Sequence, residues 1–119
     1  MIKLQRVYEV PRAEGYRILV DRLWPRGLSK EKVKADLWLK EIGPSNGLRK
    51  WFGHDVRNWP EFRERYFREL DGKSELVAKI IEKSRTLNVI LLYGAQDESH
   101  NNAVALKEYI KIKMKNEKY

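Results

Sequence analysis

Two short apolar runs constrain the fold of this chain more than any other feature. They read "YRILV" from residue 16 and "VILLY" from residue 89. Runs of this length, rich in β-branched and aliphatic residues, are typical of strands that are buried on both faces. We therefore predict strands over residues 16–22 and 88–94. Helical patterns precede and follow the second run, which predicts an α/β layered sandwich: a small mixed, mostly parallel sheet flanked by helices.

Weaker patterns predict the rest of the sheet. Residues 2–8 contain Val7 and Tyr8 but alternate poorly, which indicates a strand near an edge. Only a short gap, containing Pro11 and Gly15, separates this strand from the next. A parallel crossover needs a dozen or more residues, so we expect an antiparallel hairpin here. Residues 35–42 alternate with a period of two, which favours a short strand, although a helix also fits.

Capping residues mark the expected helix starts, because their side-chain oxygens accept hydrogen bonds from free backbone amides. The candidates are Ser29, Ser45 or Asn46, Asn58 and Ser74. The helix after Asn58 has the clearest pattern, since one apolar stripe runs along it. That stripe consists of Trp59, Phe62, Tyr66 and Leu70. A last helix follows the "AQDESHNN" segment.

Size and composition exclude several classes of protein. A chain of 119 residues is expected to form one domain over residues 1–119. No apolar run approaches the roughly 20 residues of a membrane span, and the first residues lack a secretory pattern, so we expect a cytoplasmic protein without membrane contact. With no cysteine, disulfides, thiol catalysis and cysteine-bound metals are excluded. Asp97 and His100, with a distant Glu, could bind a metal, but their spacing matches no standard signature, so no metal site is expected, and the sequence does not identify a cofactor.

The net charge of +8 favours negatively charged partners such as phosphates, acidic metabolites or nucleic acid. Five lysines lie in the last 13 residues, which predicts a basic end to the terminal helix. A second basic cluster, at residues 49–52, combines Arg49 and Lys50 with two aromatic rings. Such a cluster suits the binding of single-stranded nucleic acid, but it is also what a core segment with a solvated flank looks like.

Polar residues follow both apolar runs. Asp21, Arg22 and Arg26 follow the first, and a segment that extends to His100 and Asn101 follows the second. Open α/β sheets bind ligands beyond the carboxyl ends of their strands, so the two segments form one site if these strands are parallel neighbours. Arginines and a helix start favour an anion. The alternative is a structural rim, with an Asp21–Arg22 ion pair and Trp24 covering the core.

The stretch "GYRILVDRLWPRGLSKEKVKADLWLKEIGPSNGLRKWFGHD", with "FRERYFREL" and "VILLYGAQDESHNNAVALKEYI", closely resembles the YeaO-like branch of the Domain of Unknown Function 488 (DUF488) family. The resemblance covers nearly the whole chain and implies an α/β sandwich, but it brings no established function. It also implies recurring polar positions, which add Lys40, Ser45, Arg49 and Tyr93 to the candidate site. Longer members of the family resemble this chain but carry cysteines where it has Tyr93-Gly94 and His100-Asn101-Asn102, so thiol chemistry does not transfer.

The leading hypothesis is a protein that binds a phosphate- or carboxylate-bearing small molecule at the carboxyl edge of the sheet. Its candidate ligand-binding residues are Arg22, Arg26, Lys40, Ser45, Arg49, Tyr93 and Asn101. Asp21 and His100 are the acid–base candidates if the ligand is turned over, and the residues do not decide whether this is an enzyme. The alternatives are a nucleic-acid-binding module that uses the basic surface and an accessory protein that binds another protein. The oligomeric state is open.

Overall fold

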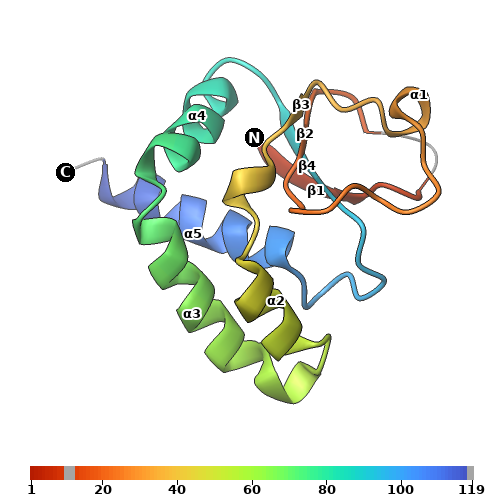
Figure 1. Ribbon diagram of the computed structural model, residues 1–119. Helices are drawn as coiled ribbons and strands as arrows, with labels where there is room; N and C mark the ends of the chain where they lie inside the picture. Colours follow the sequence, from red (N-terminus) through yellow and green to blue (C-terminus); the bar gives the residue numbers. More distant parts are fainter. Residues whose placement is uncertain (10–12, 118–119) are drawn as a thin grey trace.

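A four-stranded parallel sheet forms the centre of the computed structural model, which describes residues 1–9 and 13–117 (Figure 1). The strands are β1 (Ile2–Arg6), β2 (Tyr16–Leu19), β3 (Leu37–Trp38) and β4 (Val89–Tyr93). Their order is β1-β4-β2-β3, and every pair is parallel. The α/β class and the edge position of the first strand are therefore confirmed.

The expected antiparallel hairpin between the first two strands is wrong. β4 lies between them, and Val89 pairs with Ile2 on one side and with Tyr16 on the other. β1 and β2 are both parallel to β4, so the short connection between them did not require a hairpin. Pro11, expected in this loop, lies outside the described residues. The central position suits β4, because all five of its residues are buried.

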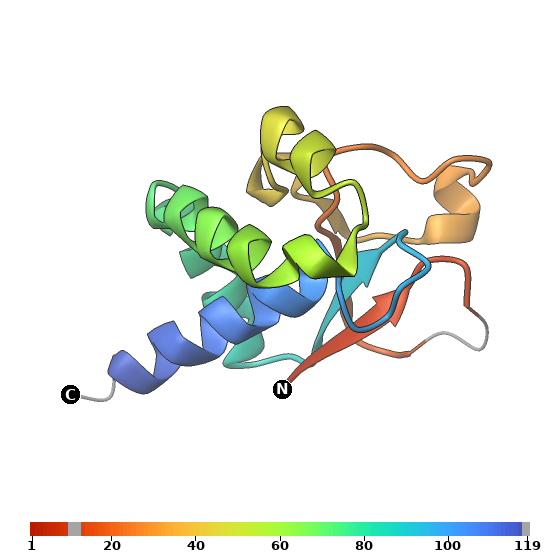
Figure 2. The ribbon, with the colours of Figure 1, turned by 90° about the horizontal axis from the view of Figure 1, so that it is seen from below.

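Across residues 1–9 and 13–117, five helices surround the sheet. They are α1 (Lys30–Val33), α2 (Asn46–Phe52), α3 (Trp59–Asp71), α4 (Ser74–Ser84) and α5 (Asn102–Asn116), with 3-10 turns η1 (Lys40–Ile42) and η2 (Val56–Asn58). The four longer helices, α2 to α5, cover one face, whereas α1 lies beyond the other (Figure 2). Within the described residues, no helix is both long enough and apolar enough to cross a membrane.

The core has two parts, one on each face of the sheet. Val89, Leu91 and Tyr93 of β4 join the large cluster under α2 to α5. Ile90 and Leu92 point the opposite way, into a smaller cluster that includes Val33 of α1. Alternation along the strand thus serves two apolar layers, which explains why the sequence shows a continuous apolar run.

Two of the predicted helix caps are confirmed. The Ser29 side chain accepts a hydrogen bond from the Lys32 amide at the start of α1. At the start of α2, the Ser45 side chain accepts one from the Leu48 amide. Residues 35–42 contain the two-residue strand β3 followed by the 3-10 turn η1, so the alternating pattern predicted only the first half of this segment correctly.

Of the other two predicted caps, one is in its expected position and one is wrong, although both helices are present. Asn58 occupies the N-cap position of α3 but makes no side-chain capping bond. It ends η2, where the Asp55 side chain accepts a hydrogen bond from the Arg57 amide, so the chain is already turning before Asn58. Ser74 is the first residue of α4 rather than its cap. The predicted stripe of α3 holds, since Phe62, Tyr66 and Leu70 are buried.

Candidate functional site

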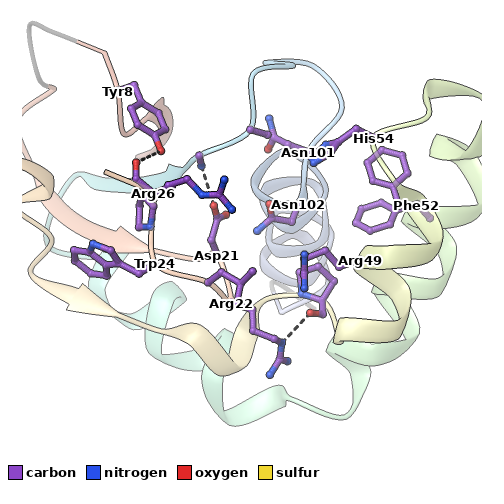
Figure 3. A pocket seen from close by; sticks show the side chains of 16 residues that line it. Tyr8, Asp21, Arg22, Trp24, Arg26, Arg49, Phe52, His54, Asn101 and Asn102 are labelled. Carbon is purple, nitrogen blue, oxygen red and sulfur yellow. Dashed lines mark hydrogen bonds between the residues drawn. The ribbon is translucent and has the colours of Figure 1, made fainter. Parts of the chain in front are cut away.

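A cavity of about 260 Å³ lies at the carboxyl ends of β2 and β4, where the two polar segments meet (Figure 3). Its polar lining residues are Asp21, Arg22, Arg26, Arg49, His54, Asn101 and Asn102. The remaining lining is aromatic, aliphatic or small: Tyr8, Leu23, Trp24, Pro25, Pro44, Phe52, Phe62, Gly94 and Ala95. The cavity therefore combines several positive groups, one acid and an aromatic wall.

Hydrogen bonds from aromatic side chains hold the loop after β2 in place. The Trp38 indole Nε1 donates to the Asp21 carbonyl at 2.8 Å, and the Trp24 indole Nε1 donates to the Leu28 carbonyl at 2.7 Å. The Tyr8 hydroxyl donates to the Arg26 carbonyl at 2.8 Å. Because these bonds use the backbone of the loop, they fix its path and leave the Asp21 and Arg26 side chains to line the cavity.

Asp21 is the acid of the cavity. Its Oδ2 accepts a hydrogen bond from the Gly94 amide at 2.8 Å, and a Cβ on residue 94 would lie only 3.3 Å from that oxygen. Its Oδ1 is buried and has no hydrogen-bond partner. Burial raises the pKa of the Asp21 carboxyl, while the Gly94 amide, the Asn102 side chain and the charge of His54 act in the opposite direction.

Arg49, on α2, carries the second buried atom without a partner, its Nε. Its Nη2 lies 3.4 Å from Asn46 Oδ1, a long contact at the surface. Within the described part of the chain, Asp21 Oδ1 and Arg49 Nε are the buried side-chain polar atoms that lack a hydrogen-bond partner. Such atoms are rare in folded proteins and costly to leave unpaired, and here both belong to one cavity.

The start of α5 forms another side of the cavity. Asn101 is only 2% exposed; its Oδ1 accepts a hydrogen bond from the Val104 amide at 3.0 Å, as a helix cap does. Asn102 Nδ2 donates to the Val20 carbonyl at 3.1 Å and so joins the helix to the end of β2. The positive end of the α5 dipole therefore lies beside Asp21.

Arg22 lines the cavity, but its guanidinium serves the loop before α2. Nε donates to the Pro44 carbonyl at 2.9 Å, and Nη2 donates to the Gly43 carbonyl at 3.0 Å. Nη1 lies 3.6 Å from Glu41 Oε2, so Arg22 forms its ion pair with Glu41 and not with Asp21. In Figure 3 the guanidinium points away from Asp21.

Three further candidates lie outside the cavity lining. Lys40 Nζ lies 5.6 Å from the centre of the Trp38 ring. Ser45 caps α2, and its hydroxyl donates to Glu69 Oε2 at 2.6 Å. Tyr93 is 4% exposed within the large core cluster. The structure therefore gives each of these residues a structural contact away from the ligand-sized space.

His100 also lies outside the lining. Its Nδ1 is 3.0 Å from Asp97 Oδ2, and its ring meets Trp59 edge-on, with 5.3 Å between the ring centres. The amides of Ser99 and His100 donate to Asp97 Oδ1, and the Ser99 hydrogen bond is the main reason why the pKa of Asp97 is lowered. This turn shapes the approach to α5, which is the ordinary role of Asp and Ser before a helix.

The structure adds residues that sequence reasoning did not select. His54 lines the cavity after Gly53, and both residues have positive φ angles of 58° and 54°. Phe52 and Phe62 stack with 4.4 Å between ring centres and form part of the aromatic wall. The sequence did contain a hint of the position of His54, because the preceding Gly53 follows an apolar helical run and such a glycine marks the end of a helix, where the chain turns. Nothing in the residue pattern showed which way the rings would face.

Comparisons with known proteins agree with the resemblance. Residues 1–119 match the family model DUF488-N3i, described as the inactive DUF488-N3 subclade. The uncharacterised protein YeaO of Escherichia coli K12 is 39% identical over 111 residues, which cover 92% of this chain and 96% of that protein. The uncharacterised protein Rv3073c of Mycobacterium tuberculosis H37Rv is 38% identical over 76 residues, which cover 63% of this chain and 64% of that protein. No solved structure matches the chain.

Proposed function

The chain belongs to the inactive DUF488-N3 subclade, and we propose that it is a cytoplasmic protein that binds a small organic anion without turning it over. The anion carries a phosphate or a carboxylate and occupies the cavity at the carboxyl ends of β2 and β4. The volume of about 260 Å³ is below the usual range of roughly 300–1,000 Å³ for drug-sized ligands, which favours a metabolite.

Arg49 carries this proposal. A buried guanidinium nitrogen without an acceptor has lost water and gained nothing in return, and a phosphate or carboxylate oxygen would supply the missing bond. Because Nε is covered from solvent, ligand contact needs a small rotation of the Arg49 side chain. Arg26, His54 and the start of α5 line the same space and add positive charge or donors.

The proposal of binding without turnover rests on two observations. The matching family is described as inactive. In addition, the two acid–base candidates are not assembled at one place, since Asp21 lines the cavity while His100 packs against Trp59 outside the lining. A general acid or base must lie within hydrogen-bond reach of its substrate, and His100 is not in the cavity lining.

A matched pair of variants tests the proposal. Arg49→Met and Lys50→Met remove one positive charge from adjacent positions on α2, but only residue 49 lines the cavity. We expect a panel of carboxylates and phosphate esters to yield a ligand by thermal shift and calorimetry. Arg49→Met should weaken its affinity about tenfold or more, the value of a charge-assisted hydrogen bond. Lys50→Met should change it less than twofold.

The Arg49→Met and Lys50→Met variants also distinguish the proposed function from the alternative of nucleic-acid binding. Phe52 is buried in the core, and the Arg65 guanidinium lies 4.3 Å from the centre of the Trp51 ring, so one face of that ring is already occupied. Binding of a generic oligonucleotide would fall steeply with salt and weaken equally in both variants. That result, or a panel without any ligand, would overturn the proposed function.

A further inference from the structure

The two unpartnered atoms of the cavity need opposite kinds of partner. Asp21 Oδ1 accepts a hydrogen bond when the carboxyl is ionised, whereas Arg49 Nε can only donate one. Asp21 comes from the end of β2 and Arg49 from α2, and both side chains line the cavity with Asn102 between them (Figure 3). An anion alone would satisfy Arg49 and leave Asp21 unpaired.

We propose that the ligand is an anion that also carries a hydrogen-bond donor, with the negative group at Arg49 and the donor at Asp21 Oδ1. This inference rests on the proposed function and deepens it. An ionised Asp21 repels a ligand that offers only negative charge, and it attracts one that presents an N–H, an O–H or an ammonium group. Asp21 thus selects among the anions that the arginines attract.

The apolar part of the lining indicates the body of the ligand. Trp24 is a half-buried ring of the lining that is held by its bond to the Leu28 carbonyl, while the stacked rings of Phe52 and Phe62 also line the cavity but are almost wholly buried. Flat rings pack well against such walls. Aromatic amino acids and nucleoside monophosphates each combine a ring, a hydrogen-bond donor and a negative group in one molecule, and the test includes both.

Ligand pairs test the donor requirement in the unaltered protein. L-phenylalanine and 3-phenylpropionate share a ring and a carboxylate and differ by the ammonium group. Guanosine 5′-monophosphate and phenyl phosphate share a ring and a phosphate, and only the nucleotide presents ring N–H donors. We expect the donor-bearing member of one pair to bind at least about tenfold more tightly, which also identifies the ligand source.

Asp21→Asn supplies the sharper test, because Gly94 fixes the orientation of the new side chain. The Gly94 amide requires an acceptor, so the Asn carbonyl takes the place of Oδ2 and the NH₂ group takes the place of Oδ1. The cavity then presents a donor where it had an acceptor. We expect the order to reverse: the donor-bearing ligand weakens about tenfold, and the donor-free ligand binds more tightly than before.

A merely structural role of Asp21 predicts something else, namely that both members of a pair weaken alike. If donor-free ligands bind the unaltered protein as tightly as donor-bearing ones, and Arg49→Met weakens both, the proposed function stands and the donor requirement is wrong. If no ligand depends on Arg49, both fail. Should Asp21→Asn not fold, the affinity ratio within each pair in the unaltered protein decides alone.

Discussion

The direction in which a single side chain points could not be predicted from this sequence. Arg17 lies in the middle of an apolar run and is only 8% exposed. Its guanidinium donates to the carbonyls of Lys34, Ala13 and Val33 at 3.0–3.2 Å, so a buried cation ties β2 to the chain around α1. Residue types predicted that Asp21 and Arg26 would meet Asn101 near one strand edge. They could not predict where a guanidinium points, because that depends on carbonyls distant in sequence.

Asp21 should leave a signature in the pH dependence of stability. Burial raises the pKa of its carboxyl in the folded protein, so the folded state binds a proton more readily than the unfolded state between the ordinary value near 3.8 and the raised one. Stability conferred through this group therefore increases as the pH falls through that window. The ionised carboxylate is unfavourable at neutral pH.

Asp21→Asn tests this directly, because it removes the carboxyl whose titration is in question. We expect the free energy of unfolding of the unaltered protein, relative to that of the variant, to rise as the pH falls from 7 toward 4. Urea unfolding at a series of pH values measures the difference. A constant difference, or one that falls, would show that burial does not perturb this carboxyl.

Among the strands and helices too, some features could be predicted from the sequence and others could not. Apolar runs and the Ser29 and Ser45 caps predicted strands and helix starts correctly, since both signals are local. The pairing of strands was predicted wrongly because β4, far along the chain, inserts between β1 and β2, and no local pattern encodes that event. The path from η1 to α2 could not be predicted from the sequence either, because it depends on contacts with distant residues. The Arg22 guanidinium and Lys73 Nζ both donate to the Gly43 carbonyl, Lys73 at 3.1 Å.

The loop before α2 has no room for a side chain at Gly43, and this can be tested by substitution. A Cβ at residue 43 would lie 2.8 Å from the Arg22 backbone nitrogen and 3.2 Å from the Val20 carbonyl oxygen. Backbone atoms cannot yield as a flexible side chain does, so we expect Gly43→Ala to destabilise the protein by about 1–3 kcal/mol. Loss of ligand affinity should accompany this, because the loop carries α2 and hence Arg49.

Gly47→Ala is the matched control. Nothing lies within 4 Å of the added Cβ, and residue 47 is in the first turn of α2, where Ala is preferred over Gly. Stability should rise by up to about 1 kcal/mol. Denaturant melts of the two variants compare them, and equal effects would disprove the close approach of Gly43 to Arg22.

Over the whole molecule, the net charge of +8 is spread over a body of 37 × 35 × 21 Å. At about 10 mM salt the screening length is roughly 30 Å, so the excess positive charge repels itself across the whole body. At about 100 mM it is roughly 10 Å. Net charge and fold class were both accessible from the sequence, because they depend on composition and on the period of the apolar pattern rather than on individual contacts.

Added salt should therefore stabilise the protein. We expect the melting temperature to rise by about 2–5 °C between 10 and 100 mM sodium chloride, equivalent to less than about 1 kcal/mol. Replacing the exposed Lys111 and Lys115 by Gln lowers the net charge by two and should shrink the rise. Arg49→Met should shrink it only modestly; abolition by that single change would point to chloride in the cavity instead of screening.

The strand order also dictates when the protein can assemble during its synthesis. Among the described strands, β1 pairs only with β4, and β2 pairs with β4 and β3. A ribosome that has made the first 88 residues has therefore produced three strands without the one that joins β1 to the rest. Until Val89–Tyr93 leaves the ribosome, the unfinished sheet exposes apolar surface to solvent. The sheet can therefore be completed only late in synthesis, and the incomplete chain is prone to aggregation until then.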